Sequence, residues 1–176
     1  MKHILLFLAL SSTILFTSCE GPEGPPGEPG GLVYGQVFEA NVNFQYDATS
    51  STFISPFISF PVEVYESDVI LAYRFEGTET INGEVVDIWS PLPRSLFYQD
   101  GTGDIFEYSF NHTYFDAQFV IDGNFDLSTF NDPAFLNNQL FRIAVVPSEF
   151  AKTTLSMKDL LKVLEINPTD IETVSN

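Results

Sequence analysis

Hydrophobic and polar residues alternate along the chain between residues 34 and 46. The apolar side chains share one face of an extended segment, interrupted only by Gln36: Tyr34, Phe38, Ala40, Val42, Phe44 and Tyr46. The other face carries Glu39, Asn41, Asn43 and Gln45. A period of two over this length predicts a half-buried antiparallel strand with one face toward the core and one toward water.

Seven further segments are rich in aromatic and β-branched residues and are separated by turn signals. They are residues 52–65, 68–75, 85–89, 95–99, 104–111, 114–121 and 140–146. Pro56 and Pro61 predict an edge position or a break in the first of them. The turn sequence at 100–103 predicts a hairpin between 95–99 and 104–111. About eight strands without helical periodicity between them predict a mainly β protein, an antiparallel two-sheet β-sandwich.

One amphipathic helix is expected near the C-terminus, at residues 157–166. Ser156 followed three residues later by Asp159 is typical of a helix start. An apolar stripe at helical spacing should pack on the sandwich, and it consists of Met157, Leu160, Leu161 and Leu164. Asn167-Pro168 should end the helix, which leaves residues 168–176 as a polar tail.

The N-terminal residues 1–18 read as a signal peptide. A basic start at Lys2 precedes a short apolar core, which is too brief and too soon followed by polar residues for a spanning helix. The segment ends in small residues directly before Cys19, a pattern that resembles the lipobox of bacterial lipoproteins, with Phe16 at the position where Leu is usual. Cys19 is therefore the expected lipidation site. The alternative is an ordinary secretory signal followed by a free thiol.

A Gly/Pro/Glu-rich stalk is expected at residues 19–31, after the lipidated cysteine. Residues 21–30 run in collagen-like Gly-X-Y triplets. Three triplets favour a single polyproline II stalk over a triple helix, and ten such residues reach about 30 Å at ~3.1 Å per residue. The globular domain would then be residues 32–167.

Composition narrows the range of partners. The chain has 176 residues with 24 acidic and 7 basic side chains, a net charge of −17. Loss of Lys2 with the signal peptide would leave −18 on the mature chain. Such a surface argues against nucleic acid as a partner, and attachment to a membrane would have to come from the lipid anchor. The single cysteine excludes an internal disulfide framework and CxxC sites.

The sequence gives no support for catalysis. It contains neither a G-x-S-x-G elbow, an HExxH motif nor a nucleotide-binding glycine loop. His112, the one histidine after the signal peptide, falls at an expected turn between strands and is interpreted as a solvated loop residue. Paired carboxylates would suffice for a glycosidase, but 24 acidic residues make any such pair unspecific. We therefore expect a protein that is not an enzyme, with a carboxylate-based hydrolase as the least favoured alternative.

Two kinds of ligand site remain as hypotheses. Calcium could be bound by carboxylates beside glycine turns, at Asp100 and Asp104 or at Asp122 and Asp126. Plain Asp-Gly turns are the favoured interpretation of both, so no cofactor is expected. A glycan could stack on exposed aromatic rings, for which the candidates are Trp89, Tyr98 and Tyr108. Core packing is the alternative for these rings, and for most of the 18 phenylalanines.

The chain as a whole resembles small lipoproteins of the Bacteroidetes type with a short collagen-like stalk. The residues that carry the resemblance are 19–30, 66–71, 89–93, 122–128 and 141–147. The resemblance implies an outer-membrane lipoprotein of the cell envelope, and it brings no activity with it; whether the domain is exposed on the cell surface, and in which leaflet the anchor lies, stay open. Together these features predict a lipid-anchored structural or binding module without catalysis, with a glycan- or calcium-binding surface domain as the alternative. The glycan or protein partner and the oligomeric state stay open.

Overall fold

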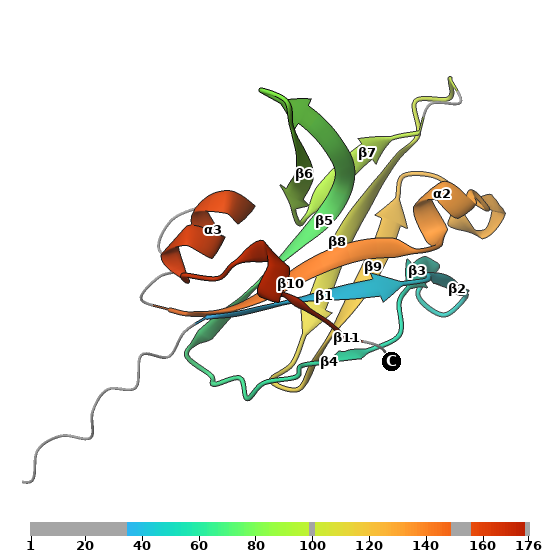
Figure 1. Cartoon of the computed structure of the whole chain (residues 1–176). Coiled ribbons are helices and arrows are strands. Elements are labelled where there is room, and N and C mark those ends of the chain that lie inside the picture. The colour runs from blue at the N-terminus through green and yellow to red at the C-terminus, as the bar shows by residue number, and fades with distance from the viewer. Residues whose placement is uncertain (1–34, 99–100, 149–155, 175–176) are drawn as a thin grey trace, which may run out of the picture. The chain divides into compact units, whose positions relative to one another are not determined.

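The computed structural model describes residues 35–98, 101–148 and 156–174, and these form a mainly β structure with two sheets (Figure 1). Sheet A has the strand order β11-β1-β10-β5-β6, and its strands are β1 (Gln36–Val42), β5 (Asp68–Ile81), β6 (Glu84–Pro91), β10 (Gln139–Pro147) and β11 (Glu172–Val174). Sheet B has the order β2-β3-β9-β8-β7 with β4 paired to β9. Its strands are β2 (Gln45–Asp47), β3 (Thr52–Ile54), β4 (Ile58–Ser59), β7 (Arg94–Phe97), β8 (Ile105–His112) and β9 (Asp116–Gly123).

Helical segments are few and short. Two are α-helices, α2 (Pro133–Leu136) and α3 (Met157–Val163), and two are 3-10 turns, η2 (Leu127–Thr129) and η3 (Pro168–Asp170). None of the described helices is long and apolar enough to cross a membrane.

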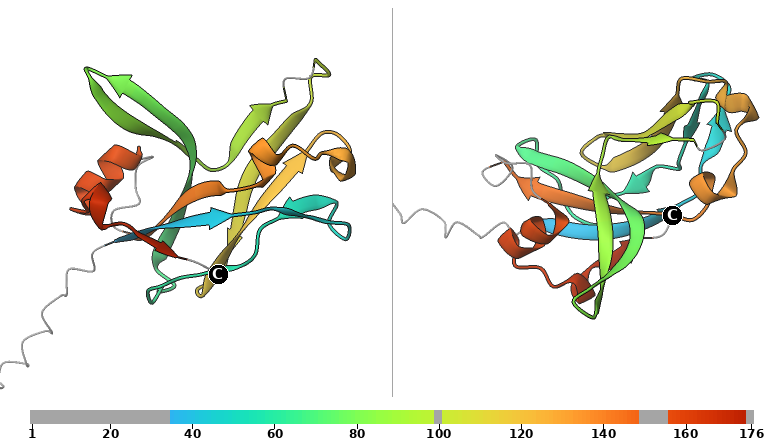
Figure 2. Two further views of the ribbon diagram at one scale, coloured as in Figure 1. Left: turned by 45° about the vertical axis from the view of Figure 1, so that its right-hand side comes forward. Right: turned by 90° about the horizontal axis from the view of Figure 1, so that it is seen from above.

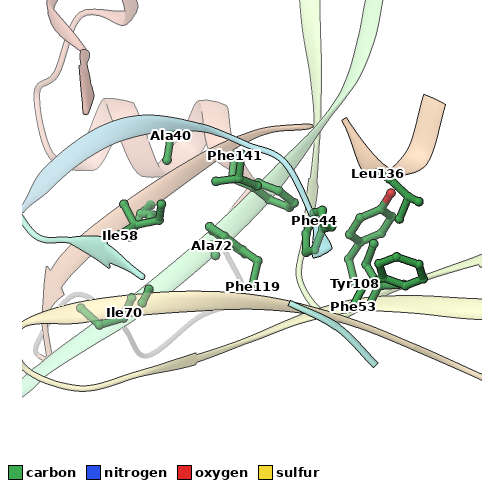
Figure 3. Packing of buried hydrophobic residues seen from close by; sticks show 14 of the residues in the cluster. Ala40, Phe44, Phe53, Ile58, Ile70, Ala72, Tyr108, Phe119, Leu136 and Phe141 are labelled. Atoms are coloured by element: carbon green, nitrogen blue, oxygen red, sulfur yellow. The ribbon is translucent and has the colours of Figure 1, made fainter. Parts of the chain in front are cut away.

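The main core lies between the two sheets (Figure 3). Phe119 of β9 and Phe141 of β10 are both fully buried, and their rings stack with centroids 3.9 Å apart and planes 14° apart. Ile121 of sheet B and Ile143 of sheet A belong to the same cluster. Aromatic residues therefore hold the two sheets together, as expected for most of the phenylalanines.

Strand β10 is buried on both of its faces. Phe141, Ile143 and Val145 belong to the core between the sheets, whereas Ala144 and Val146 belong to a second cluster with α3. Two covered faces explain why this strand reads as an apolar run broken only by Arg142 and without alternation. Sheet A is thus covered by sheet B on one side and by α3 on the other.

Helix α3 covers sheet A with the expected apolar stripe. Met157, Leu160, Leu161 and Leu164 are all buried there, and the Ser156 side chain accepts a hydrogen bond from the Asp159 backbone N–H. The helix ends at Val163, three residues before the expected boundary, and Glu165 takes a positive φ of 56° just beyond it. A left-handed residue is a common way for a helix to end.

The structure corrects the expected number of strands and the antiparallel arrangement. All eight expected segments contain strands, but the first two are each divided, and β11 forms after the helix, so that the described residues form eleven strands in all. The chain leaves β10 after Val42, where the Phe44 N–H donates to the Leu136 carbonyl at 2.8 Å, and it continues as β2 in sheet B. The second segment divides into β3 and β4 around Pro56, whose ring removes a ladder donor.

The expected polar tail is also corrected. Residues 168–174 contain η3 and β11, and β11 pairs in parallel with β1, with Phe38 opposite Glu172 and Ala40 opposite Val174. The helix is therefore not the last element, and sheet A is mixed. Cys19 and the stalk lie outside the described residues.

Candidate binding groove

The carboxylates considered for calcium serve as turn and cap residues. The Asp126 carboxylate caps η2, accepting from the Ser128 hydroxyl at 2.6 Å and from its N–H at 3.0 Å, and these bonds lower the pKa of Asp126. Asp122 accepts from the neighbouring Gly123 N–H at 2.7 Å. Asp104 is half-buried at the start of β8, and Asp100 lies outside the described residues. Within the described ranges, His, Cys, Asp and Glu form no group of three or more suited to a metal ion.

The three aromatic candidates do not form one exposed strip. Tyr108 is fully buried, its hydroxyl donates to the Phe135 carbonyl at 2.7 Å, and burial raises its pKa. Tyr98 is half-buried against an aromatic cluster, stacking on Phe125 and meeting Phe130 edge-on. Trp89 alone lies on the outer face of sheet A, beside α3. Tyr108 and Tyr98 therefore pack in the core, which was the alternative for these rings, whereas Trp89 lines a cavity.

A groove of about 750 Å³ lies between the β5–β6 hairpin and α3. Figures 1 and 2 show the outer part of the hairpin rising away from sheet A on the side that carries the helix. The hairpin contributes Ile81, Val85, Val86, Asp87, Ile88 and Trp89, β10 contributes Arg142, and the helical segment contributes Ser156, Met157, Lys158, Leu161, Lys162, Ile166 and Pro168. The volume lies within the range of about 300–1,000 Å³ typical of small-molecule sites.

A β-bulge separates the hairpin from the sheet. The register between β5 and β6 shifts between Phe75 and Gly77, and Gly77 takes a φ of 124°, which strongly favours glycine. Bulges increase local twist and bend the strand that carries them. Beyond the bulge the pairing continues to Ile81 opposite Glu84 without a further strand beside β5. The part of the hairpin beyond Gly77, here called the arm, therefore has no neighbouring strand in sheet A and forms one wall of the groove.

The hairpin wall exposes apolar side chains toward solvent. Val85 is 71% exposed, Ile81 51% and Ile88 38%. Scattered apolar residues are ordinary on a protein surface, but exposed apolar residues that line a concave site mark a place where a ligand or a partner is bound.

The floor of the groove is built from Trp89 and Arg142. The Arg142 guanidinium lies over the Trp89 ring, 4.0 Å from its centroid, close enough for a cation–π interaction. Arg142 Nε donates to Glu39 Oε1 at 2.8 Å across the β1–β10 register, and Asp87 lies 3.8 Å from its Nη2. Only 7% of the Arg142 side chain is exposed. The floor thus carries a buried positive charge with one close carboxylate partner.

The Trp89 indole leaves a polar group unpaired. Its Nε1–H is buried and has no hydrogen-bond acceptor among the described residues. An unpaired buried donor costs about 1–3 kcal/mol. This N–H is therefore an unsatisfied donor beside the floor of the groove.

A second concave surface lies at the end of the domain formed by the β4–β5 connection and the β8–β9 turn. Its volume is about 420 Å³, and it is lined by Phe60, Val62, Glu63, Val64, Tyr65, Glu66, Tyr114 and Phe115. Tyr65, Tyr114 and Phe115 are at least half exposed, and the Tyr65 hydroxyl donates to Glu63 Oε2 at 3.1 Å. This second concavity, here called the aromatic end, therefore combines exposed aromatic rings with carboxylates. The sequence suggested such groups at other residues. His112 is exposed as expected, but it is the last residue of β8, opposite Ala117, and not a loop residue.

The groove was not predicted from the sequence, although two features of the sequence are consistent with it. Both faces of β6 carry apolar side chains, those of Val85, Val86 and Ile88. A hairpin surrounded by water would be expected to carry polar residues on at least one face. Three of the seven basic residues, Lys152, Lys158 and Lys162, fall close together in an otherwise acidic chain. Neither signal indicates that the two segments meet, because that requires the hairpin to leave the sheet at Gly77.

Comparison with known proteins gives no further guide. No protein-family model, no curated protein and no solved structure matches this chain.

Proposed function

We propose that this chain is a non-catalytic binding protein of the cell envelope. In this proposal it is a lipoprotein anchored in the outer membrane through Cys19, and its β-sandwich binds an apolar small molecule in the groove between the β5–β6 hairpin and α3. The observation that carries the proposal is a groove of about 750 Å³ whose wall leaves Val85 71% exposed. Burial of such side chains by a ligand is favourable by roughly 25 cal/mol per Å² of apolar surface.

The chemistry of the lining supports binding over catalysis. The described residues of the groove include one carboxylate, Asp87, and neither histidine nor cysteine. A glycosidase would need two carboxylates facing the same substrate, and an acyl-transfer site would need a nucleophile beside a base. The lining therefore offers shape and apolar contact, with a few polar groups to orient a ligand.

Trp89 makes the proposal directly testable, because it is the only tryptophan of the chain. Titration with N-phenyl-1-naphthylamine, an uncharged apolar probe, should quench Trp89 emission by energy transfer and should saturate. Val85→Asp should weaken binding at least tenfold, because it places a charge on the apolar wall. Val163→Asp is the matched control, since Val163 is exposed on α3 but does not line the groove. Equal weakening by both variants, or no saturable quenching, would overturn the assignment.

Anchoring is tested separately by fractionation. Cys19→Ala should move the chain from the membrane to the soluble fraction, because acyl chains contribute about 0.8 kcal/mol per buried methylene and the acidic domain adds no attraction of its own. Retention of Cys19→Ala in the membrane fraction would refute the lipid anchor.

Glycan binding at the aromatic end is a second candidate function. The observation in its favour is that Tyr65, Tyr114 and Phe115 line one concavity together with Glu63 and Glu66. Aromatic faces offer stacking surface and carboxylates accept hydroxyl hydrogen bonds. A glycan array probed with the domain from Leu32 onward should show hits that Phe115→Ala abolishes and Phe97→Ala does not. Phe97 is a suitable control because it is 72% exposed on β7, away from this concavity.

A further inference from the structure

The charge of the groove is opposite to that of the chain. Acidic residues outnumber basic ones by 24 to 7 overall. The described residues contain five lysines and arginines, Arg74, Arg94, Arg142, Lys158 and Lys162. Three of these five line the groove, against one carboxylate, Asp87. Because Glu39 pairs with Arg142, the excess positive charge comes from Lys158 and Lys162. An anion approaching this protein therefore meets a favourable potential at the groove and repulsion over most of the remaining surface.

The basic side chains differ in position in a way that suits a ligand with two parts. Lys158 and Lys162 are exposed, four residues apart on α3, whereas Arg142 is buried in the floor beside Trp89. The apolar wall of the hairpin lies opposite the helix in the same groove. We propose that the ligand is a single-chain amphiphile, with an apolar tail against the apolar side chains that line the groove, Val85 among them, and an anionic head group held by the basic side chains.

The Arg142 environment supports an anion in particular. Its Nε is used by Glu39, while the nearest carboxylate to Nη2 is Asp87 at 3.8 Å, beyond hydrogen-bond distance. A guanidinium with free Nη donors pairs well with a carboxylate or a phosphate. An oxygen of the same head group also provides the type of acceptor that the buried Trp89 Nε1–H lacks among the described residues.

This inference rests on the proposed function and adds the class of ligand to it. The experiment compares three ten-carbon ligands, decanoate, decyl phosphate and decanol, by Trp89 fluorescence below their aggregation concentrations. The anions should bind about tenfold more tightly than decanol, a difference of about 1.4 kcal/mol. Added salt should weaken the anions and leave decanol unchanged. The tighter of the two anions identifies whether the head group is a carboxylate or a phosphate.

Variants of the helix test which residues carry the preference. Lys158→Gln with Lys162→Gln should reduce the affinity for the anions at least fivefold and leave that for decanol unchanged. Lys158→Arg with Lys162→Arg should retain the preference, because the charge remains. Arg94→Gln should have no effect, since Arg94 lies on β7 and does not line the groove. Each of these positions is exposed, so the fold should tolerate the changes.

The outcomes separate this inference from the proposed function. Equal binding of decanol and decanoate would overturn the anionic head group and leave apolar binding in place. Absence of binding by all three ligands would overturn both. Light scattering on the same samples tests the remaining occupant, a second copy of the chain. A dimer that Val85→Asp converts to a monomer would overturn the amphiphile in favour of self-association.

Discussion

The ion pair between Glu39 and Arg142 supports the floor of the groove, and its removal should have a measurable cost. Glu39→Gln leaves Arg142 with Asp87 as its nearest carboxylate, at 3.8 Å. A hydrogen bond to a charged group contributes about 1.5–3 kcal/mol, and loss of one partner of a fully buried pair costs about 3–5 kcal/mol. Glu39 is 19% exposed, and glutamine still presents an acceptor oxygen. We therefore expect the free energy of unfolding to fall by about 2 kcal/mol.

Urea denaturation followed by Trp89 fluorescence measures the free energy of unfolding, and the Trp89 ring lies beside Arg142. Thermal denaturation gives the same change as a shift in Tm. For a unit the size of residues 33–176, about 2 kcal/mol corresponds to a fall in Tm of roughly 8 °C. Glu79→Gln is the matched control, because Glu79 is exposed on the β5 arm, and its effect should stay within about 0.5 kcal/mol.

A double-mutant cycle with Arg142→Met separates the ion pair from other effects of the substitution. Methionine removes the charge and keeps apolar bulk over the Trp89 ring. Without Arg142 there is no buried charge to leave unpaired, so Glu39→Gln should cost less than 0.5 kcal/mol in that background. A cost for Glu39→Gln that is the same in both backgrounds, or below about 0.5 kcal/mol in the native one, would refute this account of the floor.

Three other predictions concern the core and the turns. Because burial raises the pKa of Tyr108, the folded chain should keep this proton above about pH 10 while the unfolded chain loses it, so stability should decline with rising pH there. In urea midpoints between pH 9 and 11, Tyr108→Phe should flatten this decline, and an unchanged slope would contradict the assignment. Gly35→Ala should destabilise the chain by about 1–3 kcal/mol, because the new Cβ would lie 2.5 Å from Leu164 Cδ2 and 3.0 Å from the Val145 carbonyl oxygen; a neutral effect would show that Leu164 can move aside. Millimolar calcium should leave Tm unchanged, and a rise of several degrees would instead assign a metal site to the aspartate turns.

The sequence predicts much of the fold because short-range patterns determine it. The alternation of Phe38, Ala40 and Val42 identified the inward face of β1, and all three side chains are buried. The turn residues at 100–103 predicted the β7–β8 hairpin, and β7 and β8 pair antiparallel with Phe97 opposite Ile105. Such features need only neighbours along the chain, so they can be read from one sequence.

Features that depend on distant segments could not be predicted in this way. The three residues of β11 are too few to show a period, and they become a strand because β1 offers a free edge. Tyr98 and Tyr108 are candidates for an exposed platform by type, yet the cluster around Phe106, Phe130 and Phe135 covers them. The groove itself results from a single bulge in β5, which no local pattern indicates.

The central claim is that the groove beside Trp89 binds an apolar or amphipathic molecule, and one NMR measurement tests it most directly. A ¹⁵N-labelled chain has a single tryptophan and therefore a single indole N–H cross-peak. Saturating decanoate should shift this cross-peak in the native chain and in Val163→Asp, and should leave it unmoved in Val85→Asp. A cross-peak that stays in place in the native chain, or that moves equally in Val85→Asp, would contradict the account.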